Sequence, residues 1–279
     1  MNDTISSNNK TTINWFPGHM KSALEMIKTE LKLCDIIIYM LDARCPKSCL
    51  NPKYEEFLDR KPVLFIANKA DLALPNASLR GACDEAIQTV FLNSTQSGTA
   101  KKVTEAINHI LRDKIKTADA KGIKKTIRAI VIGVTNCGKS TFINNLAAKG
   151  KTMTGDRPGV TRTKQWVPAT EHLYLLDTPG TLWPKFDNPQ VAKNLAYVGS
   201  IKDDILDTTA VAKDLIADLT RLDPHCIKKR FNADTFEDIC RKRGYILKGG
   251  ILDEERAAKA ILVEFRAGKL GRFNLDDLL

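Results

Sequence analysis

The feature that most constrains this chain is the segment 133–140, which reads Gly-Val-Thr-Asn-Cys-Gly-Lys-Ser. An apolar run, residues 127–132, precedes it, and apolar residues at helical spacing follow it. A strand, a glycine-containing loop and a helix in this order are typical of a phosphate-binding P-loop, in which backbone N–H groups and the helix dipole face phosphate oxygens. The residues expected to contact a nucleotide here are Thr135, Asn136, Cys137, Gly138, Lys139, Ser140 and Thr141.

A second motif reads Asp-Thr-Pro-Gly and runs from Asp177 to Gly180, directly after the apolar run 173–176. It places an acid at the carboxyl end of a predicted strand, where a carboxylate can reach the shell of a bound Mg²⁺. We expect the Gly180 N–H to bind the γ-phosphate. In the P-loop, Lys139 is expected to reach the β- and γ-phosphates, and Ser140 to hold the Mg²⁺ through its hydroxyl.

Residues 150–162 are rich in glycine and polar side chains and lack periodicity, which suits a switch loop. Within it, Thr161 is the residue expected to contact both Mg²⁺ and the γ-phosphate when a nucleoside triphosphate is bound. The predicted Mg²⁺ ligands are therefore Ser140, Thr161 and Asp177.

A third motif, Asn68-Lys69-Ala70-Asp71, follows the apolar run 63–67 and is expected to read the base. In such a motif the aspartate accepts hydrogen bonds from N1–H and the 2-amino group of guanine, donors that adenine lacks. A site built for these donors rejects ATP, because the carboxylate would be left unpaired. An ATPase remains the alternative if Asp71 does not read guanine. After a short strand, residues 90–92, the backbone of Asn93, Ser94 and Thr95 is expected to contact guanine from its other side.

The order of these motifs is informative, because in an ordinary GTPase the guanine motif follows the P-loop, whereas here it precedes it. Such a circular permutation can preserve a fold, since domain termini tend to lie close together at the surface. The sequence at this point resembles the circularly permuted GTPases of ribosome assembly, most closely the RbgA/YlqF type. The segments 14–20 (Asn-Trp-Phe-Pro-Gly-His-Met), 42–46 (Asp-Ala-Arg-Cys-Pro) and 51–52 (Asn-Pro) are similar to that family too.

The resemblance implies a GTPase that binds the large (50S) ribosomal subunit, its rRNA and proteins, late in assembly. GTP binding would promote docking, and hydrolysis to GDP would promote release. The resemblance also implies that Asn136 helps to coordinate K⁺ beside the phosphates, although Thr135 and Cys137 replace the usual neighbours in the loop. The alternative for Asn136 is that its side chain only satisfies backbone groups of the loop.

Water activation needs a separate group, because the positions after Gly180 hold Thr181 and Leu182 instead of the glutamine of Ras-like enzymes. The family supplies His19 as the candidate, since an imidazole that titrates near neutrality can orient or deprotonate water. A structural role for His19 stays open. We expect a low intrinsic rate, stimulated by the ribosomal subunit, with His19, Lys139, Thr161 and Gly180 as the catalytic set.

Composition favours a polyanionic partner. The 279 residues carry a net charge of +10 with a pI near 9.2, which indicates RNA or an anionic membrane surface. The longest apolar stretch, residues 36–41, is too short to span a bilayer. The polar first ten residues resemble neither a signal peptide nor an organelle transit peptide. Seven cysteines without a Cys-x-x-Cys pair favour a reducing compartment, and we expect a cytoplasmic monomer.

Two domains are predicted. Residues 1–188, with a flexible tail at 1–12, would form an α/β GTPase domain with a mostly parallel sheet and helices on both faces. Residues 189–279 would form a small all-α domain that binds RNA or the ribosome, because periodic apolar patterns there indicate four or five helices and no strand. Two basic clusters in it, 228–230 and 241–243, would face phosphates, with solvated surface as the alternative.

A basic connector lies between the two nucleotide motifs. Residues 100–128 hold nine Lys or Arg against three Asp or Glu, a net charge of +6, and residues 103–115 are predicted to form one helix. A solvated helix face and a direct RNA contact both fit this pattern. Two further function classes stay open, a nucleotide-gated RNA-binding protein with negligible hydrolysis and an organelle version of the same GTPase.

Overall fold

A six-stranded sheet in the order β3-β2-β1-β4-β6-β5 forms the centre of the first part of the protein. The computed structural model describes residues 18–75, 88–148 and 166–279. Four strand pairs are parallel, and only β5 runs antiparallel to its neighbour β6, so the predicted mostly parallel sheet is confirmed. The strands are β1 (Ile36–Asp42), β2 (Val63–Asn68), β3 (Thr89–Leu92), β4 (Ile127–Gly133), β5 (Trp166–Thr170) and β6 (Leu173–Asp177).

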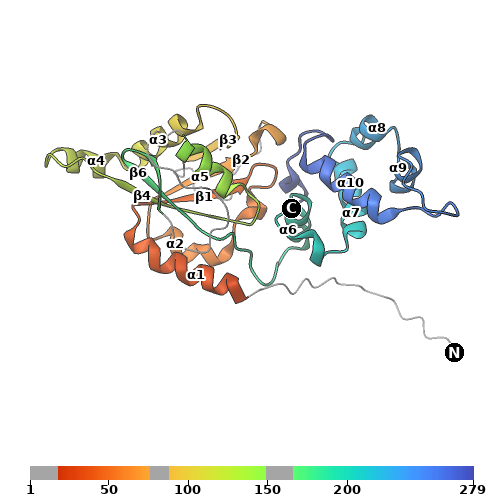
Figure 1. Cartoon of the computed structure of the whole chain (residues 1–279), viewed down its shortest axis with the longest axis horizontal. Helices are drawn as coiled ribbons and strands as arrows, with labels where there is room; N and C mark the ends of the chain where they lie inside the picture. Colours follow the sequence, from red (N-terminus) through yellow and green to blue (C-terminus); the bar gives the residue numbers. More distant parts are fainter. Residues whose placement is uncertain (1–17, 76–87, 149–165) are drawn as a thin grey trace.

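The central strands are buried because helices cover both faces of the sheet. All seven residues of β1 are buried, as expected of a strand that is apolar throughout. In Figure 1, α1 (Gly18–Glu30) and α2 (Glu55–Leu58) lie on one side of the sheet, and α3 (Thr99–Ile110) and α5 (Lys139–Ala148) lie on the other. The parallel connections therefore bring the carboxyl ends of β1, β2, β3, β4 and β6 to one edge.

The helix predicted over residues 103–115 is in fact two helices, α3 and α4 (Arg112–Asp119), and this prediction of a single helix is wrong. The chain bends at Leu111, which has φ −96° and ψ 14°. Leu111 is buried in the core, whereas α4 has no buried residue that could hold it against the sheet. As a result α4 projects from the sheet at the left edge of Figure 1.

Five helices form the C-terminal part of the chain, within the predicted number. They are α6 (Pro189–Tyr197), α7 (Thr208–Leu222), α8 (Cys226–Phe231), α9 (Phe236–Lys242) and α10 (Glu254–Arg266). Four of the five begin at a side chain that accepts a hydrogen bond from a first-turn N–H, and these N-caps are Asn188, Asp207, Thr235 and Asp253. Among residues 189–279 the structure has no strand, only an isolated bridge between Ile246 and Leu252.

The end of the chain returns to the sheet. The buried carboxylate of Asp276 accepts hydrogen bonds from Lys47 N (2.6 Å), Ser48 N (3.2 Å) and Ser48 Oγ (2.6 Å), in the segment that follows β1. Leu275 N donates to Arg44 O at 2.7 Å. The helical part is thus fixed to the carboxyl edge of the sheet. In the described part of the chain, no helix combines the length and the apolar character needed to cross a membrane.

Candidate nucleotide-binding site

The motifs predicted from the sequence meet at the carboxyl edge of the sheet. The guanine motif follows β2, the Asn93 segment follows β3, the P-loop follows β4, and Asp177 ends β6. Residues separated by more than 100 positions in the chain are therefore brought together by strand order alone. Such an edge of a parallel sheet is where α/β proteins bind nucleotides.

Two glycines shape the P-loop because no side chain fits at their positions. Gly133 has φ +149°, and a Cβ there would lie 2.3 Å from Met40 O. Gly138 has φ +101°, and a Cβ there would lie 2.2 Å from Asn68 Nδ2. Both values are far below van der Waals contact, so the loop packs directly against β1 and the guanine motif.

Lys139 lies across the loop at the start of α5. Its ammonium donates to Gly133 O at 3.0 Å and to Val134 O at 2.7 Å, and the residue is buried. A Cβ built on Gly180 would lie 2.8 Å from Lys139 Nζ and 2.7 Å from Thr135 Cα. Gly180 and Lys139 therefore stand side by side, as needed for an N–H and an ammonium that bind the same phosphate group.

Ser140 and Asp177 form a pair of oxygen donors suited to Mg²⁺. Ser140 Oγ donates to Asp177 Oδ2 at 3.1 Å, and the other carboxylate oxygen, Oδ1, is buried without a hydrogen-bond partner in the described structure. Burial raises the pKa of Asp177. Carboxylate and hydroxyl oxygens are the ligands that Mg²⁺ prefers, so the residues present fit this ion. Thr161, the third predicted ligand, lies outside the described residues.

Asn68 joins the P-loop to the segment after β3. Its amide nitrogen donates to Cys137 O at 2.9 Å, and its amide oxygen accepts from Ser94 N at 2.9 Å and from Ser94 Oγ at 2.8 Å. Asn68, Ser94 and Cys137 are all buried. The first residue of the guanine motif thus positions the other two elements, and these contacts do not involve the base itself.

Lys69 links the guanine motif both to the P-loop and to the buried carboxylate of Asp42. It adopts the left-handed backbone conformation (φ 59°), and its ammonium donates to Asn136 O at 2.8 Å and to Asp42 Oδ2 at 2.9 Å. Asp42 is also bonded by Arg44 through Nη2 (2.8 Å) and Nε (2.9 Å). Burial favours a raised pKa for Asp42, but the positive charges of Arg44 and Lys69 outweigh it and hold that pKa well below its usual range.

Sequence reasoning missed the roles of Asp42 and Arg44, although it noted their segment as part of a family likeness. The available signal was an acid at the end of the apolar strand β1, the same signal that identified Asp177 at the end of β6. Arg44 also lies 5.4 Å from the centre of the Phe265 ring on α10, so this ion pair reaches from the guanine motif to the helical part of the protein.

The predicted reader of guanine, Asp71, is exposed on a short 3-10 helix (Ala70–Leu72). It lines a cavity of about 310 Å³ together with Asn93, and Arg272 from the end of the chain lines the same cavity. Asn93 Oδ1 accepts from Thr95 N (2.9 Å) and Thr95 Oγ1 (2.7 Å), which closes the turn after β3. Asp71 and the Asn93 turn therefore flank one opening.

Two P-loop residues contact the helical part of the protein. Thr135 Oγ1 donates to Ser200 O, and Asn136 Nδ2 donates to Gly199 O at 2.7 Å, just after the end of α6. Asn136 has φ +57°, a conformation that asparagine tolerates better than most residues. Because its nitrogen faces Gly199, the amide oxygen is the atom left to accept a cation.

The residues after Gly180 face the core and not the nucleotide. Thr181 is fully buried, and its hydroxyl is hydrogen-bonded to Tyr54 OH at 2.6 Å and to Asn51 Nδ2 at 3.2 Å. Leu182 is fully buried too.

His19 stands in the first turn of α1, and its side chain lies outside what the structure describes. Thr141 is exposed on α5, next to Ser140.

Comparison with known proteins gives one family match. Residues 128–233 match the protein family described as 50S ribosome-binding GTPase. This match begins inside β4, so it contains the P-loop and Asp177 but not the guanine motif at 68–71.

Similar proteins span nearly the whole chain. Ribosome biogenesis GTPase A from Priestia megaterium is 39% identical over 279 residues, which cover 95% of this chain and 97% of that protein. The protein of the same name from Thermotoga maritima is 30% identical over 264 residues, 95% and 94% of the two chains. The GNP-bound crystal structure of YlqF from T. maritima has a TM-score of 0.63 and 25% identity, and the match covers 90% of this chain and 96% of that one. A GDP-bound structure of TM YlqF matches with the same score and identity.

Proposed function

The chain belongs to the ribosome biogenesis GTPase A family, a group of GTP hydrolases of ribosome assembly, and from that premise we propose how its residues carry out the cycle. In the GTP state the protein binds the precursor of the large (50S) ribosomal subunit, promotes a late step of its assembly, and leaves after hydrolysis. The circularly permuted order of the motifs fits the same family.

The observation that carries this proposal is the position of Asn68. The guanine motif precedes the P-loop by about 65 residues in the chain, yet Asn68 is hydrogen-bonded to both Cys137 and Ser94. These bonds hold the guanine motif against the P-loop, as a single site for base and phosphates requires. The proposed GTP contacts are therefore those of the sequence motifs, with Asp71 on guanine and Lys139 on the β- and γ-phosphates.

Residues of the chain itself supply most of the proposed chemistry. The Gly180 N–H and the Lys139 ammonium, which lie side by side, bind the γ-phosphate and stabilise the charge that develops on it. Ser140 and Asp177, with Thr161, would hold Mg²⁺, and the Asn136 amide oxygen would hold K⁺. When bound, these cations supply positive charge at the phosphates, as an arginine finger does in other GTPases.

Water activation is assigned to His19. Thr181 and Leu182, which follow Gly180, are buried and face the core, so neither is placed to orient an attacking water. His19 lies at the start of α1, and the intrinsic rate is proposed to stay low until the ribosomal subunit positions the His19 imidazole against the attacking water.

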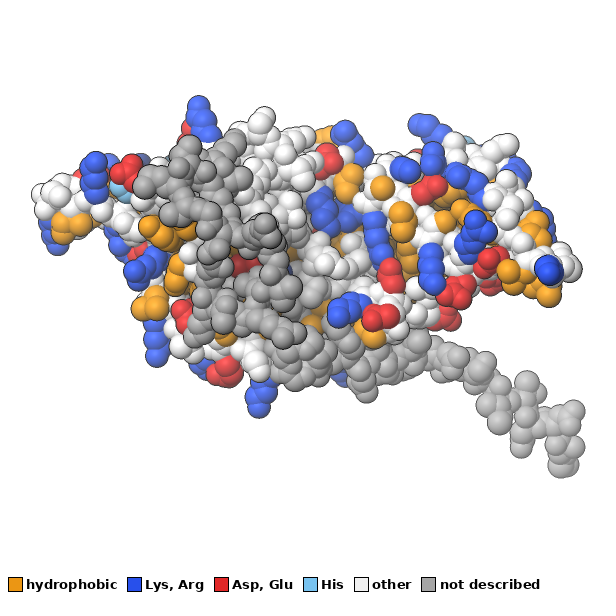
Figure 2. All heavy atoms as spheres, in the orientation of Figure 1, with side chains coloured by type: hydrophobic (Ala, Val, Ile, Leu, Met, Phe, Trp, Pro, Cys, Tyr) orange, Lys and Arg blue, Asp and Glu red, His pale blue; other side chains and the backbone are white. Residues whose placement is uncertain are grey.

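We assign residues 1–188 to GTP binding and residues 189–279 to contacts with rRNA and ribosomal proteins. The helical part is suited to a polyanionic partner, since residues 221–272 hold thirteen Lys or Arg against eight Asp or Glu. Figure 2 shows many of these basic side chains on the surface of α7 to α10. The cycle is proposed to run in the cytoplasm with a monomeric protein. Six free cysteines among the described residues, all buried, suit a reducing compartment.

Co-sedimentation with large ribosomal subunits tests the proposed cycle. Purified protein is centrifuged with mature subunits and with precursor subunits, under GDP and under a non-hydrolysable GTP analogue. We expect stronger binding with the analogue and to the precursor. Equal binding under the two nucleotides would contradict GTP-gated docking, and equal binding to both kinds of subunit would contradict a role late in assembly.

A further inference from the structure

A basic surface lies at the edge of the sheet opposite the nucleotide site. It is formed by residues 112–126, which comprise α4 and the connector to β4, and we name it the α4 surface. Because β4 has seven residues that rise by about 3.3 Å each, this surface lies roughly 20 Å from the P-loop. Figure 1 shows α4 at the end of the molecule farthest from α8 and α9.

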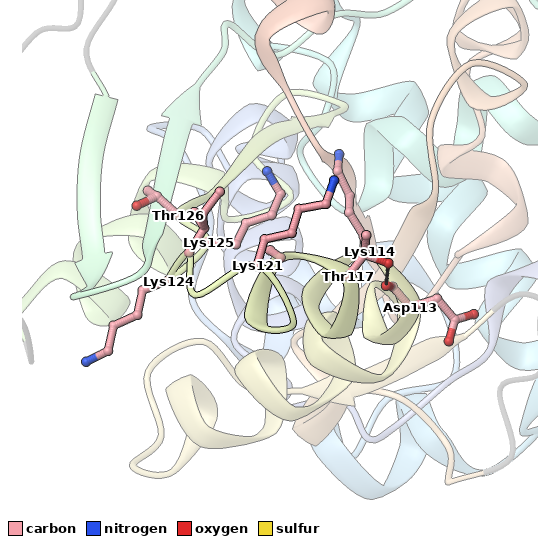
Figure 3. A pocket seen from close by; sticks show the side chains of 9 residues that line it. Asp113, Lys114, Thr117, Lys121, Lys124, Lys125 and Thr126 are labelled. Carbon is pink, nitrogen blue, oxygen red and sulfur yellow. Dashed lines mark hydrogen bonds between the residues drawn. The ribbon is translucent and has the colours of Figure 1, made fainter.

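The charge of the α4 surface is strongly one-sided. It holds six basic residues, Arg112, Lys114, Lys116, Lys121, Lys124 and Lys125, against two acidic residues, Asp113 and Asp119. In Figure 3 the side chains of Lys114, Lys121 and Lys125 extend in the same direction, whereas Lys124 and the Asp113 carboxylate point away from them; all five residues line one hollow. The hollow has a volume of about 640 Å³. Four of the six basic residues line this hollow, so most of the positive charge of the α4 surface is gathered around it.

Asp35 holds part of this surface in a fixed arrangement. The carboxylate lies just before β1 and is paired with Lys114, and with Lys125 at 3.3 Å. Arg128 N, in β4, donates to the same carboxylate at 3.0 Å. These contacts tie both α4 and the connector to the sheet. Although α4 buries no residue of its own, these ion pairs anchor it and the connector, which lowers the ordering cost of binding a partner.

Other lysines of the α4 surface have no internal carboxylate. Lys116, Lys121 and Lys124 are exposed, and none lies within 4.0 Å of an Asp or Glu oxygen in the described part of the chain. Such cations remain available to an external anion.

The basic clusters of the helical part differ in this respect. Arg230 and Arg243 both pair with Glu264, at 2.6 Å and 3.6 Å, and Lys228 pairs with Asp234 at 3.4 Å. With Arg241 paired to Asp238, four of their six basic residues are neutralised within the fold. On the α4 surface three of six are paired, Arg112 with Asp113 and both Lys114 and Lys125 with Asp35, so more of its positive charge is left for a polyanion.

We propose that the α4 surface is a second RNA-binding surface, which contacts the phosphate backbone of ribosomal RNA independently of the helical part of the protein. The proposal rests on the proposed function for the presence of rRNA, and the location of the contact comes from the structure. RNA is favoured over a membrane because the only large exposed apolar side chain among residues 112–126 is Ile123, too little for insertion into lipid. Lysines around a hollow match the repeated phosphates of an RNA strand.

The test compares two double variants. Lys121→Gln with Lys124→Gln removes two of the unpaired cations. Lys32→Gln with Lys53→Gln removes the same charge at exposed positions near α1 and α2 and serves as the matched control, since neither lysine lies within 4.0 Å of a carboxylate oxygen of residues 18–75, 88–148 or 166–279. The probe is a fluorescein-labelled RNA duplex of 20 base pairs, and fluorescence anisotropy gives its affinity at several KCl concentrations.

Loss of two phosphate contacts has a calculable effect. Each contact contributes about 0.9 to the slope of log affinity against log salt, so the slope should fall by about 1.8 in the Lys121/Lys124 variant. Between 50 and 200 mM KCl, the wild-type affinity should then change about 12-fold more than that of the variant. The control should keep the wild-type slope. A slope equal to that of the control would overturn the proposal.

Binding to ribosomal subunits separates the remaining outcomes. With the GTP analogue present, the Lys121/Lys124 variant should bind large subunits less tightly than the control, with unchanged GTP affinity. If subunit binding falls while duplex binding does not, the surface contacts a ribosomal protein and the RNA assignment is wrong. If the wild-type protein itself fails to bind subunits, the proposed function is wrong. The slope of log affinity against log salt, measured on the RNA duplex, still tests whether the α4 surface binds RNA.

Discussion

Replacing Asn68 with alanine removes the side chain that connects the P-loop to the segment after β3. The Asn68 side chain makes three hydrogen bonds, one to Cys137 O and two from Ser94, and all three residues are buried. The variant leaves the carbonyl of Cys137 and both donors of Ser94 without this partner. Lys139 and Asp71 keep their own side chains, so any effect on binding acts through their relative position.

The cost of this change follows from the three contacts. A buried hydrogen bond contributes about 0.5–1.5 kcal/mol, so the free energy of unfolding should fall by about 3 kcal/mol. The matched control is Asn93→Ala, which removes two hydrogen bonds inside an exposed turn with Thr95. Because water can replace those contacts, the control should lose less than about 1 kcal/mol.

Urea unfolding of the nucleotide-free proteins measures the first effect, and titration with a fluorescent GDP analogue measures the second. A loss of about 3 kcal/mol corresponds to a change of more than 100-fold in the folding equilibrium. We expect the Asn68→Ala protein to bind GDP at least 10-fold more weakly than the wild-type protein, since its site is no longer preorganised. If Asn68→Ala loses no more stability than Asn93→Ala, or binds GDP as the wild type does, Asn68 does not connect the two parts of the site.

Four further predictions concern the nucleotide site. Asp71→Asn should weaken GTP binding and admit xanthosine triphosphate in competition assays, because the amide can donate to the xanthine oxygen; an unchanged preference for GTP would mean that another residue reads the base. GTP hydrolysis should be faster in K⁺ than in Na⁺ at matched ionic strength, and Asn136→Ala should remove the difference; equal wild-type rates exclude the cation role. His19→Ala should retain GTP and subunit binding but lose stimulated hydrolysis by about 100-fold or more, whereas a loss of about twofold would make His19 structural. Although Asp42 is buried, Arg44 and Lys69 hold its pKa below the usual range, so its carboxylate stabilises the fold above about pH 4 and this contribution is lost as the pH falls. Asp42→Asn should therefore flatten the acid branch of the stability curve by up to about 1.4 kcal/mol per pH unit, and an unaltered branch would contradict the assignment.

The sequence predicted the motifs of the site well because each follows an apolar strand. Asn68, Gly133 and Asp177 lie at the carboxyl ends of strands, and parallel strands bring those ends to one edge whatever their order in the chain. Proximity in space thus follows from local patterns alone. For the same reason, the permuted order of the motifs did not prevent the sequence from predicting a single nucleotide site.

The contacts that join the motifs were not predictable in the same way. Arg44 and Lys69 share Asp42, and no spacing rule links an acid at the end of one strand to a lysine after the next. The bend at Leu111 was not predicted either, because the helical spacing of apolar residues continues through it. The position of the bend depends on where the sheet, against which α3 packs, comes to an end. Such features depend on which surfaces are available, a property of the folded chain.

The contacts of the P-loop with the helical part limit how strongly nucleotide can move those helices. Thr135 and Asn136 bind the carbonyls of Ser200 and Gly199, and Arg266 of α10 binds the neighbouring Tyr197 O at 3.0 Å, so loop, α6 and α10 form one network. A ligand shifts an equilibrium only by its difference in affinity for the two states. At about 0.5–1.5 kcal/mol for each of the two P-loop bonds, breaking both changes the balance between docked and released helices by about 1–3 kcal/mol, roughly 5- to 150-fold. A larger response to GTP therefore requires contacts from elsewhere, and the ribosomal subunit is the partner able to provide them.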